Sequence, residues 1–324
     1  MDIGIEDIVF TVNYGDKEIN LTGQVFRPRN FEEKSQKLPP IVFNSGFAGG
    51  VSMYGQLFGR ALAERGYCVM TYDVAGFYTN KHARNIVQQG DLTLTNVSLE
   101  DQKDEVLGAI AWTQKAFGRM PAVVSWAMGA TASLAAIAQL ARAGGPQVAF
   151  YAPLNYTRIS SLQNLRADKA AAHASLMALA DDDAIPPFDT GTQKTRLGFY
   201  PLDTDTQAYV DEQLGAYTEA ASVERWPGCI HMTASSYKDY VAFDPEAGLN
   251  GSAGFPPALI VHGADNTLHL PEEAVHLHGV YPGDATDGPY IIGGMAHGQQ
   301  NQPDNAIFRQ MIDQIDRNIA TRAA

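Results

Sequence analysis

The sequence predicts an α/β protein with a mostly parallel central sheet, helices on both faces of the sheet and an inserted helical cap. Two observations support this. Short apolar runs alternate with amphipathic helical runs in the first half, and the alternation stops after Pro153 and resumes near the end of the chain. Alternating strands and helices predict parallel pairing, because each crossover returns the chain to the same edge. We expect a core of residues 1–153 and 257–324, with a cap of residues 154–256.

The chain opens with two extended runs, residues 8–14 and 21–27, joined by a turn at Gly15-Asp16-Lys17. Such runs around a glycine-containing turn predict an antiparallel hairpin. Residues 41–43 form a short apolar run, typical of a strand covered on both faces. A helix of residues 54–65 should follow and end at Gly66.

The next helix is expected at residues 99–117, with Ser98 as its N-cap, because its apolar residues recur at helical spacing. The alanine-rich helix of residues 162–180 and a helix at residues 209–223 are expected in the cap, which is rich in aromatic residues and should cover the site. The remaining core strands are expected at residues 67–72, 122–124, 148–151, 258–263 and 290–292, and the remaining core helices at residues 130–142, 271–278 and 304–321.

The stretch from Ser125 to Gly129 follows a short buried strand and leads into a helix. A strand, a sharp turn and a helix form the nucleophile elbow of α/β-hydrolases, usually written G-x-S-x-G. The closing glycine is present, but Ala127 stands at the nucleophile position. A methyl group cannot attack a carbonyl. Ser125 lies two residues before the apex, within the strand, so we do not assign it as nucleophile.

Two further residues stand where a catalytic triad needs them. Asp265 comes directly after a buried strand, and His297 comes just after the last strand. An imidazole can take a proton from a nucleophile while a carboxylate fixes its tautomer. The order elbow, Asp, His is the order of α/β-hydrolases. We therefore expect Ala127, Asp265 and His297 to meet at the carboxyl edge of the sheet.

The oxyanion hole is expected from backbone N–H groups at Phe47 or Ala48, in a glycine-rich loop, and at Met128 after the elbow. Trp126, Tyr54 and Phe77 flank the predicted site in sequence and are candidates to line a substrate pocket. For each of the three, a place in the core is at least as good an interpretation. His262 is expected to make a structural hydrogen bond.

These motifs resemble the dienelactone-hydrolase-like group of α/β-hydrolases, which includes small bacterial esterases and fungal polyketide thiohydrolases and acyltransferases. The likeness covers nearly the whole chain and includes the loop of residues 44–50, the Asp73 turn, the elbow, Trp226-Pro227, the segment to Asp265 and Gly-x-x-His297. It implies the α/β-hydrolase fold and a triad acting on an ester, thioester or lactone. Members of the group carry Ser or Cys at the elbow, with Gly two residues earlier.

Three functional interpretations remain open. The first is a hydrolase or acyltransferase whose nucleophile is replaced by Ala127, so that Ala127→Ser restores turnover. The second is a natural non-covalent enzyme, in which His297 acts as a base or the cavity serves as a cyclase or isomerase template. The third is a ligand-binding pseudoenzyme.

Charge and composition restrict the partners. The chain carries 23 Lys and Arg against 36 Asp and Glu, a formal net charge of −13, which disfavours nucleic acid and anionic membranes. Cys68 and Cys229 have no metal or redox spacing, and we expect neither metal nor cofactor. The first residues show no signal-peptide pattern. We expect a cytoplasmic protein acting on a small-molecule acyl substrate, with a homodimer left open.

Overall fold

The computed structural model describes residues 2–28, 37–46, 54–77, 80, 85–158, 170–185, 232–250, 254–266, 269–298 and 303–323. Its centre is an eight-stranded sheet in the order β1-β2-β4-β3-β7-β8-β11-β12. The strands are β1 (Ile3–Tyr14), β2 (Lys17–Pro28), β3 (Ile41–Asn44), β4 (Val69–Tyr72), β7 (Ala122–Trp126), β8 (Phe150–Leu154), β11 (Val261–Gly263) and β12 (Tyr290–Ile292). From β4 to β12 neighbouring strands run parallel, whereas β1 and β2 form the antiparallel edge.

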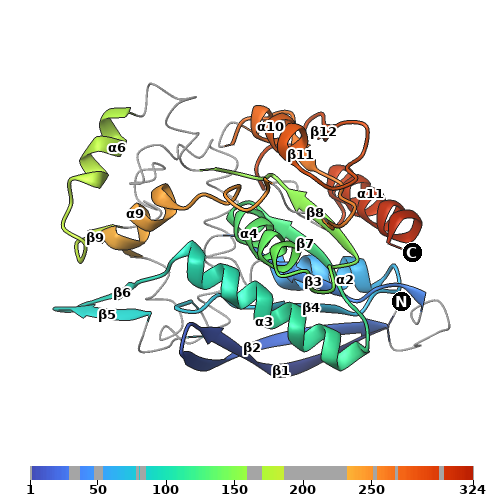
Figure 1. Cartoon of the computed structure of the whole chain (residues 1–324), viewed down its shortest axis with the longest axis horizontal. Helices are drawn as coiled ribbons and strands as arrows, with labels where there is room; N and C mark the ends of the chain where they lie inside the picture. The colour runs from blue at the N-terminus through green and yellow to red at the C-terminus, as the bar shows by residue number, and fades with distance from the viewer. Residues whose placement is uncertain are drawn as a thin grey trace.

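Helices cover both faces of this sheet (Figure 1). The core helices are α2 (Gln56–Ala63), α3 (Leu99–Phe117), α4 (Met128–Arg142), α10 (Glu272–Val280) and α11 (Ala306–Arg322). Buried residues of α3, α4 and α10 belong to one hydrophobic cluster, and those of α2 and α11 belong to a second. The two clusters lie on opposite faces of the strands, because successive strand residues point to opposite sides. The predicted α/β architecture is confirmed.

The expected hairpin forms with a two-residue turn at Gly15 and Asp16, which pairs Tyr14 with Lys17. Ser98 caps α3 as predicted, since its hydroxyl accepts a hydrogen bond from the Asp101 N–H at 3.0 Å. Strand β8 begins two residues later than expected and extends through Pro153 to Leu154.

A second sheet, in the order β5-β6-β10-β9, combines segments from both sides of the elbow in sequence. Its strands are β5 (Ile86–Gln89), β6 (Leu92–Thr95), β9 (Ala184–Ile185) and β10 (Met232–Thr233), and the helices α6 (Ala170–Met177) and α9 (Ala234–Ala242) flank β9 and β10 in the chain. Within residues 154–256, where we expect a mainly helical cap, the described part therefore holds strands as well as helices. The expected helix at residues 209–223 lies outside the described residues, as do residues 159–169.

This second sheet lies beside the carboxyl end of β4. The Thr95 hydroxyl donates to the Gly76 carbonyl at 3.2 Å, in the turn after β4. The backbone N–H of Val97 donates to the Ser236 hydroxyl of α9 at 2.9 Å. Figure 1 shows α6 and α9 at the same end of the molecule as β5, β6 and β9. These elements are placed where they can border a site at the carboxyl edge.

A charge network ties both ends of the segment of residues 154–256 to α10. Arg158, which leaves the core after β8, pairs with the fully buried Glu273 of α10 at 3.0 Å. Glu246, near the other end of the segment, accepts from the Tyr156 hydroxyl at 2.9 Å and lies 2.8 Å from His276 Nε2. Buried ion pairs add little net stability, but breaking one leaves an uncompensated charge. The network therefore holds the two ends in one geometry relative to α10.

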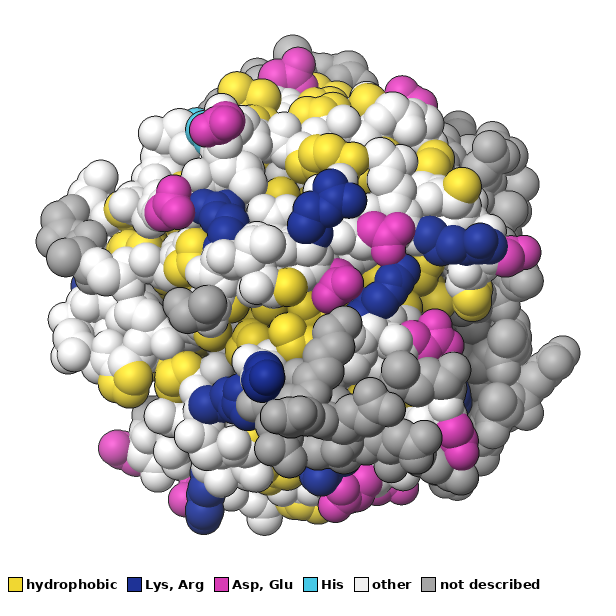
Figure 2. All heavy atoms as spheres, turned by 90° about the vertical axis from the view of Figure 1, so that its right-hand side faces the viewer, with side chains coloured by type: hydrophobic (Ala, Val, Ile, Leu, Met, Phe, Trp, Pro, Cys, Tyr) yellow, Lys and Arg dark blue, Asp and Glu magenta, His cyan; other side chains and the backbone are white. Residues whose placement is uncertain are grey.

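Charged side chains of both signs share the face that carries α11. Figure 2 shows Lys and Arg beside Asp and Glu around hydrophobic patches on this side. Arg65, just after α2, pairs with Asp313 of α11 at 2.5 Å, and Arg322 pairs with Asp284 at 2.9 Å. Among the described residues, no helix is both long enough and apolar enough to cross a bilayer.

The buried carboxyl group of Glu105 binds the turn after β4 by a hydrogen bond. Glu105 of α3 accepts hydrogen bonds from the Tyr14 hydroxyl at 2.9 Å and from the Ala75 N–H at 3.3 Å. Burial raises the pKa of Glu105 to about 8, although both hydrogen bonds oppose the shift. Removal from water disfavours the charged form more than two neutral donors favour it.

We predict that Glu105→Gln stabilises the protein increasingly as the pH rises. Between 4.5, the ordinary pKa, and about 8 the native state holds a proton that the unfolded state has released. The free energy of unfolding of the parent protein therefore falls with pH across that window, by up to about 1.4 kcal/mol per pH unit. Thermal unfolding of both forms across the window measures the difference. The exposed Glu64→Gln is the control, and a constant difference would contradict the prediction.

Candidate active site

The turn between β7 and α4 has a strained backbone. Ala127 adopts φ 49° and ψ −120°, a region that residues with a Cβ atom seldom occupy. Such a conformation costs on the order of 1–3 kcal/mol and persists only where its surroundings enforce it. The Ala127 N–H donates to the Leu154 carbonyl of β8 at 2.8 Å, and its carbonyl accepts from the Ala130 N–H at 2.9 Å. The predicted elbow geometry is present with a methyl group at its apex.

Gly129 allows this turn to pack against β3. A Cβ atom at Gly129 would lie 2.6 Å from the Asn44 carbonyl oxygen, closer than atoms can approach. The Asn44 amide donates to the Gly129 carbonyl at 3.0 Å and to the Ser133 hydroxyl at 3.2 Å. The Ser125 hydroxyl donates to Ser133 at 2.8 Å. Ser125 is thus engaged within a buried polar chain against α4, as its place in the strand suggests.

Met128 is the first residue of α4, so its N–H has no acceptor in the preceding turn. Among the described residues no hydrogen bond uses this N–H. It is therefore suitable as one donor of an oxyanion hole. Phe47 and Ala48, the expected source of the second donor, lie outside the described residues.

The loop that carries His297 is bonded to the loop after β11. The Asp265 N–H donates to the Met295 carbonyl at 2.9 Å, and the Ala264 N–H donates to the Ile292 carbonyl at 2.9 Å. A Cβ atom at Gly263 would lie 2.2 Å from the Met295 carbonyl oxygen, so only glycine permits this approach. Both loops follow the carboxyl ends of neighbouring parallel strands.

Asn155 connects three segments of this edge, and no sequence pattern points to it. It follows β8, is fully buried and has φ 49°, a conformation that asparagine tolerates better than most residues. Its N–H donates to the Val261 carbonyl at 2.9 Å. Its side-chain oxygen accepts from the Gly263 N–H at 3.0 Å, and its amide nitrogen donates to the His297 carbonyl at 3.0 Å. Asn155 therefore fixes the position of the His297 loop relative to the ends of β8 and β11.

The structure brings His297 to Asn266 rather than to Asp265. The Asn266 amide nitrogen lies 3.4 Å from His297 Nδ1. Asp265 has an exposed side chain, and its carboxylate makes no hydrogen bond or ion pair among the described residues. The expected contact between Asp265 and His297 is not formed. In the turn after β11 the Asp265 side chain faces solvent, whereas Asn266 is 1% exposed.

Two further histidines surround Asn266. His262 Nε2 lies 2.8 Å from the His269 carbonyl oxygen, which is the structural hydrogen bond expected of it. Burial lowers the pKa of His262 to about 4, so the ring is neutral. His269 is buried, and its Nδ1 lies 2.8 Å from the Thr157 hydroxyl. Within the described ranges, no group of three His, Cys, Asp or Glu residues is placed to hold a metal ion.

Trp126 and Tyr54 border His297 and also belong to the core. The centroid of the Trp126 ring lies 5.9 Å from that of His297, edge to face, and 5.5 Å from that of Tyr54, with the two rings tilted by 39°. A Cβ atom at Gly298 would lie 2.5 Å from the Tyr54 hydroxyl, so this hydroxyl is next to the His297 loop. Phe77 is buried in the turn after β4, two strands from β7.

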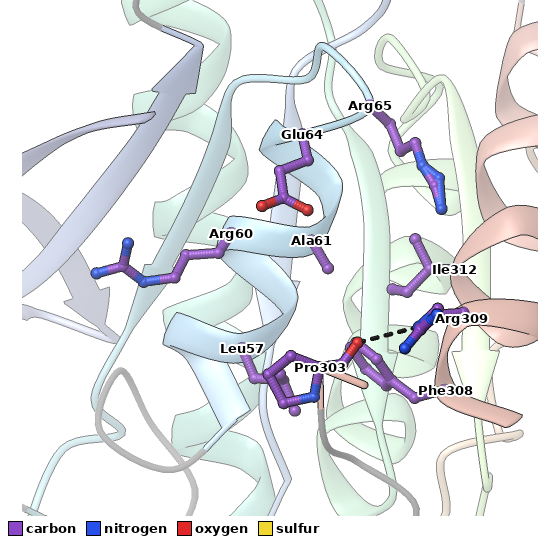
Figure 3. Close-up of a pocket in the computed structure, with 9 residues that line it drawn as sticks. All are labelled: Leu57, Arg60, Ala61, Glu64, Arg65, Pro303, Phe308, Arg309 and Ile312. Carbon is purple, nitrogen blue, oxygen red and sulfur yellow. Dashed lines mark hydrogen bonds between the residues drawn. The ribbon is translucent and has the colours of Figure 1, made fainter. Parts of the chain in front are cut away.

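A pocket of about 280 Å³ lies between α2 and α11 (Figure 3). Its apolar wall includes Phe308, whose ring meets Phe58 at 5.2 Å. Arg65 at its rim is paired with Asp313, and Arg309 donates to the backbone carbonyls of Pro303 and Asp304. The residues that line it do not include Ala127 or His297, so this pocket is separate from the candidate site.

Neither protein-family models nor curated proteins give a match to the sequence. Solved structures do match over almost the whole chain. The complex of DcsB with its substrate analogue has a TM-score of 0.67 at 14% identity and covers 98% of this chain and 100% of that one. The α/β-hydrolase GrgF from Penicillium sp. sh18 gives 0.63 at 16% identity, covering 98% and 99%. The hyperthermophilic esterase from the archaeon Pyrobaculum calidifontis gives 0.57 at 18%, covering 99% and 86%. The chain has the α/β-hydrolase fold.

We predict that Ala127→Gly raises the free energy of unfolding by about 1 kcal/mol. Glycine adopts positive φ without steric cost, and this relief should exceed its greater loss of backbone entropy. Ala136→Gly, in the regular part of α4, is the matched control and should lower stability by about 1 kcal/mol. Denaturant titrations of the three proteins measure both effects. Equal losses in both variants would show that Ala127 is not strained.

We predict that Asn155→Gly destabilises the protein by about 2–4 kcal/mol, because it leaves the His297 carbonyl and the Gly263 N–H without their buried partners. Asn155→Ala should cost about 1 kcal/mol more, since alanine is strained at this φ and glycine is not. Chemical denaturation separates the two contributions. A loss below about 1 kcal/mol for Asn155→Gly would argue that these hydrogen bonds contribute little.

Proposed function

We propose that the chain is an enzyme of the α/β-hydrolase type that binds the carbonyl group of a small ester, thioester or lactone beside Ala127. The observation that supports this most strongly is the positive φ of Ala127 between β7 and α4. This strained turn is the backbone that presents a nucleophile in α/β-hydrolases. Of the neighbours in fold, one is described as an esterase and another as bound to a substrate analogue.

The bound carbonyl would receive a hydrogen bond from the Met128 N–H, at the positive end of the α4 dipole. A second donor is expected from Phe47 or Ala48. Each preorganised donor of this kind contributes roughly 3–4 kcal/mol to stabilising a developing oxyanion. His297, held at the same edge by Asn155, would contact the substrate from the side of β12.

With a methyl group at position 127 no acyl-enzyme can form, so the proposed chemistry is non-covalent. His297 would act directly on the bound substrate. The second candidate is a covalent hydrolase or acyltransferase in which Ala127 replaces Ser or Cys. The strained turn also supports this candidate, because glycine would adopt the same conformation at lower cost, whereas a Ser or Cys nucleophile needs a Cβ atom there. A ligand-binding protein without turnover is the third.

The test introduces a thiol at the apex. Ala127→Cys places a cysteine just before α4, where the helix dipole lowers the pKa of a thiol. We expect an activated short-chain thioester or ester to acylate the introduced thiol with one acyl group per chain, as seen by intact-mass spectrometry. The parent protein with its native cysteines, and Ser125→Cys, whose side chain would be buried against Ser133, are the controls. Acylation no faster than in Ser125→Cys would contradict the proposed site.

A further inference from the structure

The side chain of Asn266 lies between three histidines. Its oxygen accepts a hydrogen bond from the His269 N–H at 3.0 Å. Its nitrogen lies 3.4 Å from His262 Nε2 and 3.4 Å from His297 Nδ1. The orientation of the amide follows from these neighbours. If the amide were turned over, its NH₂ group would face the backbone N–H of His269, and two donors would meet. The NH₂ group therefore faces the two rings.

Only one of the two rings, His262 or His297, can accept a hydrogen bond from the Asn266 amide. His262 Nε2 lies 2.8 Å from the His269 carbonyl oxygen, and a carbonyl can only accept a hydrogen bond. His262 Nε2 must therefore carry a proton. Among the described residues His262 Nδ1 has no partner, consistent with a neutral ring whose single proton is on Nε2. A protonated Nε2 cannot accept from Asn266, which leaves His297 Nδ1 as the acceptor of the two.

We propose that Asn266, and not Asp265, is the positioning residue of His297, and that its amide holds the neutral His297 ring with the proton on Nε2. A triad carboxylate does the opposite: it accepts from Nδ1–H and leaves Nε2 as the base. In this chain His297 thus presents an N–H donor at Nε2. That this donor acts on a substrate carbonyl rests on the proposed function. The assignment of the tautomer does not rest on it.

The surroundings of His297 agree with an uncharged ring. The His269 and Trp126 rings meet it edge to face at 5.1 Å and 5.9 Å. Among the residues that the structure describes, the titratable groups of the loops packed against it are His262, His269 and Asp265. Asp265 is exposed, and among the described residues no ion pair joins its carboxylate to His297.

Imidazole nitrogen chemical shifts test the tautomer. We expect that ¹⁵N-histidine-labelled protein at mildly alkaline pH, with the His297 signals assigned through His297→Gln, shows a protonated Nε2 and a bare Nδ1. Asn266→Asp should move the proton to Nδ1, because a carboxylate accepts where the amide donated. Asp265→Asn, one residue away, should leave the pattern unchanged. A proton on Nδ1 in the parent protein, or a change with Asp265→Asn alone, would overturn the proposal.

A second experiment measures the rate at which variants that all carry Ala127→Ser hydrolyse a short activated ester. The wrong histidine tautomer costs a serine protease roughly 10⁴-fold in kcat. Adding Asn266→Asp should therefore raise hydrolysis by a comparable factor, while adding Asp265→Asn should not. Measurable hydrolysis at equal rates with and without Asn266→Asp would overturn the proposal. If no variant hydrolyses any ester but the nitrogen shifts behave as expected, the proposed function fails and the role of Asn266 stands. Thermal unfolding of each variant identifies loss of fold, and the parent spectrum remains a test independent of every variant at position 266.

Discussion

The positive φ of Ala127 is the constraint on which the arrangement of the carboxyl edge depends. The turn is held from β8, because the Ala127 N–H donates to Leu154. The next residue, Asn155, is itself at positive φ and bonds to the end of β11 and to the His297 loop. Two residues at positive φ thus lie side by side at the ends of adjacent strands. The conformation of Ala127 would cost on the order of 1–3 kcal/mol alone, and both residues are stabilised by buried hydrogen bonds that also position the site.

The fold can be predicted from the sequence because its elements are local. The cap at Ser98, the hairpin turn at Gly15 and the elbow each depend on a few adjacent residues. The sequence predicts that β8 ends at residue 151, because Pro153 removes a backbone donor and usually ends a strand. In the structure β8 nevertheless continues past Pro153, pairing it with Ser125. The pairing of β6 with β10, which joins segments far apart in the chain, has no local signal.

The site is harder to predict for a physical reason. Asp265 and Asn266 are adjacent, and the chemistry of a triad favours the carboxylate. Which of the two faces His297 depends on the turn after β11, where Gly263 brings the His297 loop close and Asn266 satisfies the His269 N–H. Sequence identifies the turn but not the direction of each side chain in it. Asn155 escapes sequence reasoning for a similar reason, since its three partners are all distant in the chain.

A methyl group at position 127 and an amide at position 266 are chemically consistent with each other. A serine nucleophile needs the lone pair of Nε2, which the Asn266 amide, by donating to Nδ1, converts into an N–H donor. Ala127→Ser alone would place two donors, the serine O–H and the His297 Nε2–H, against each other. The serine hydroxyl could then only accept a hydrogen bond from His297, and it could not give up its proton to it. The site would instead direct N–H groups toward one oxygen atom, from Met128 at the start of α4 and from His297. Such an arrangement polarises a carbonyl without forming a bond to it, and it still requires the strained turn, because that turn is what aims the Met128 N–H.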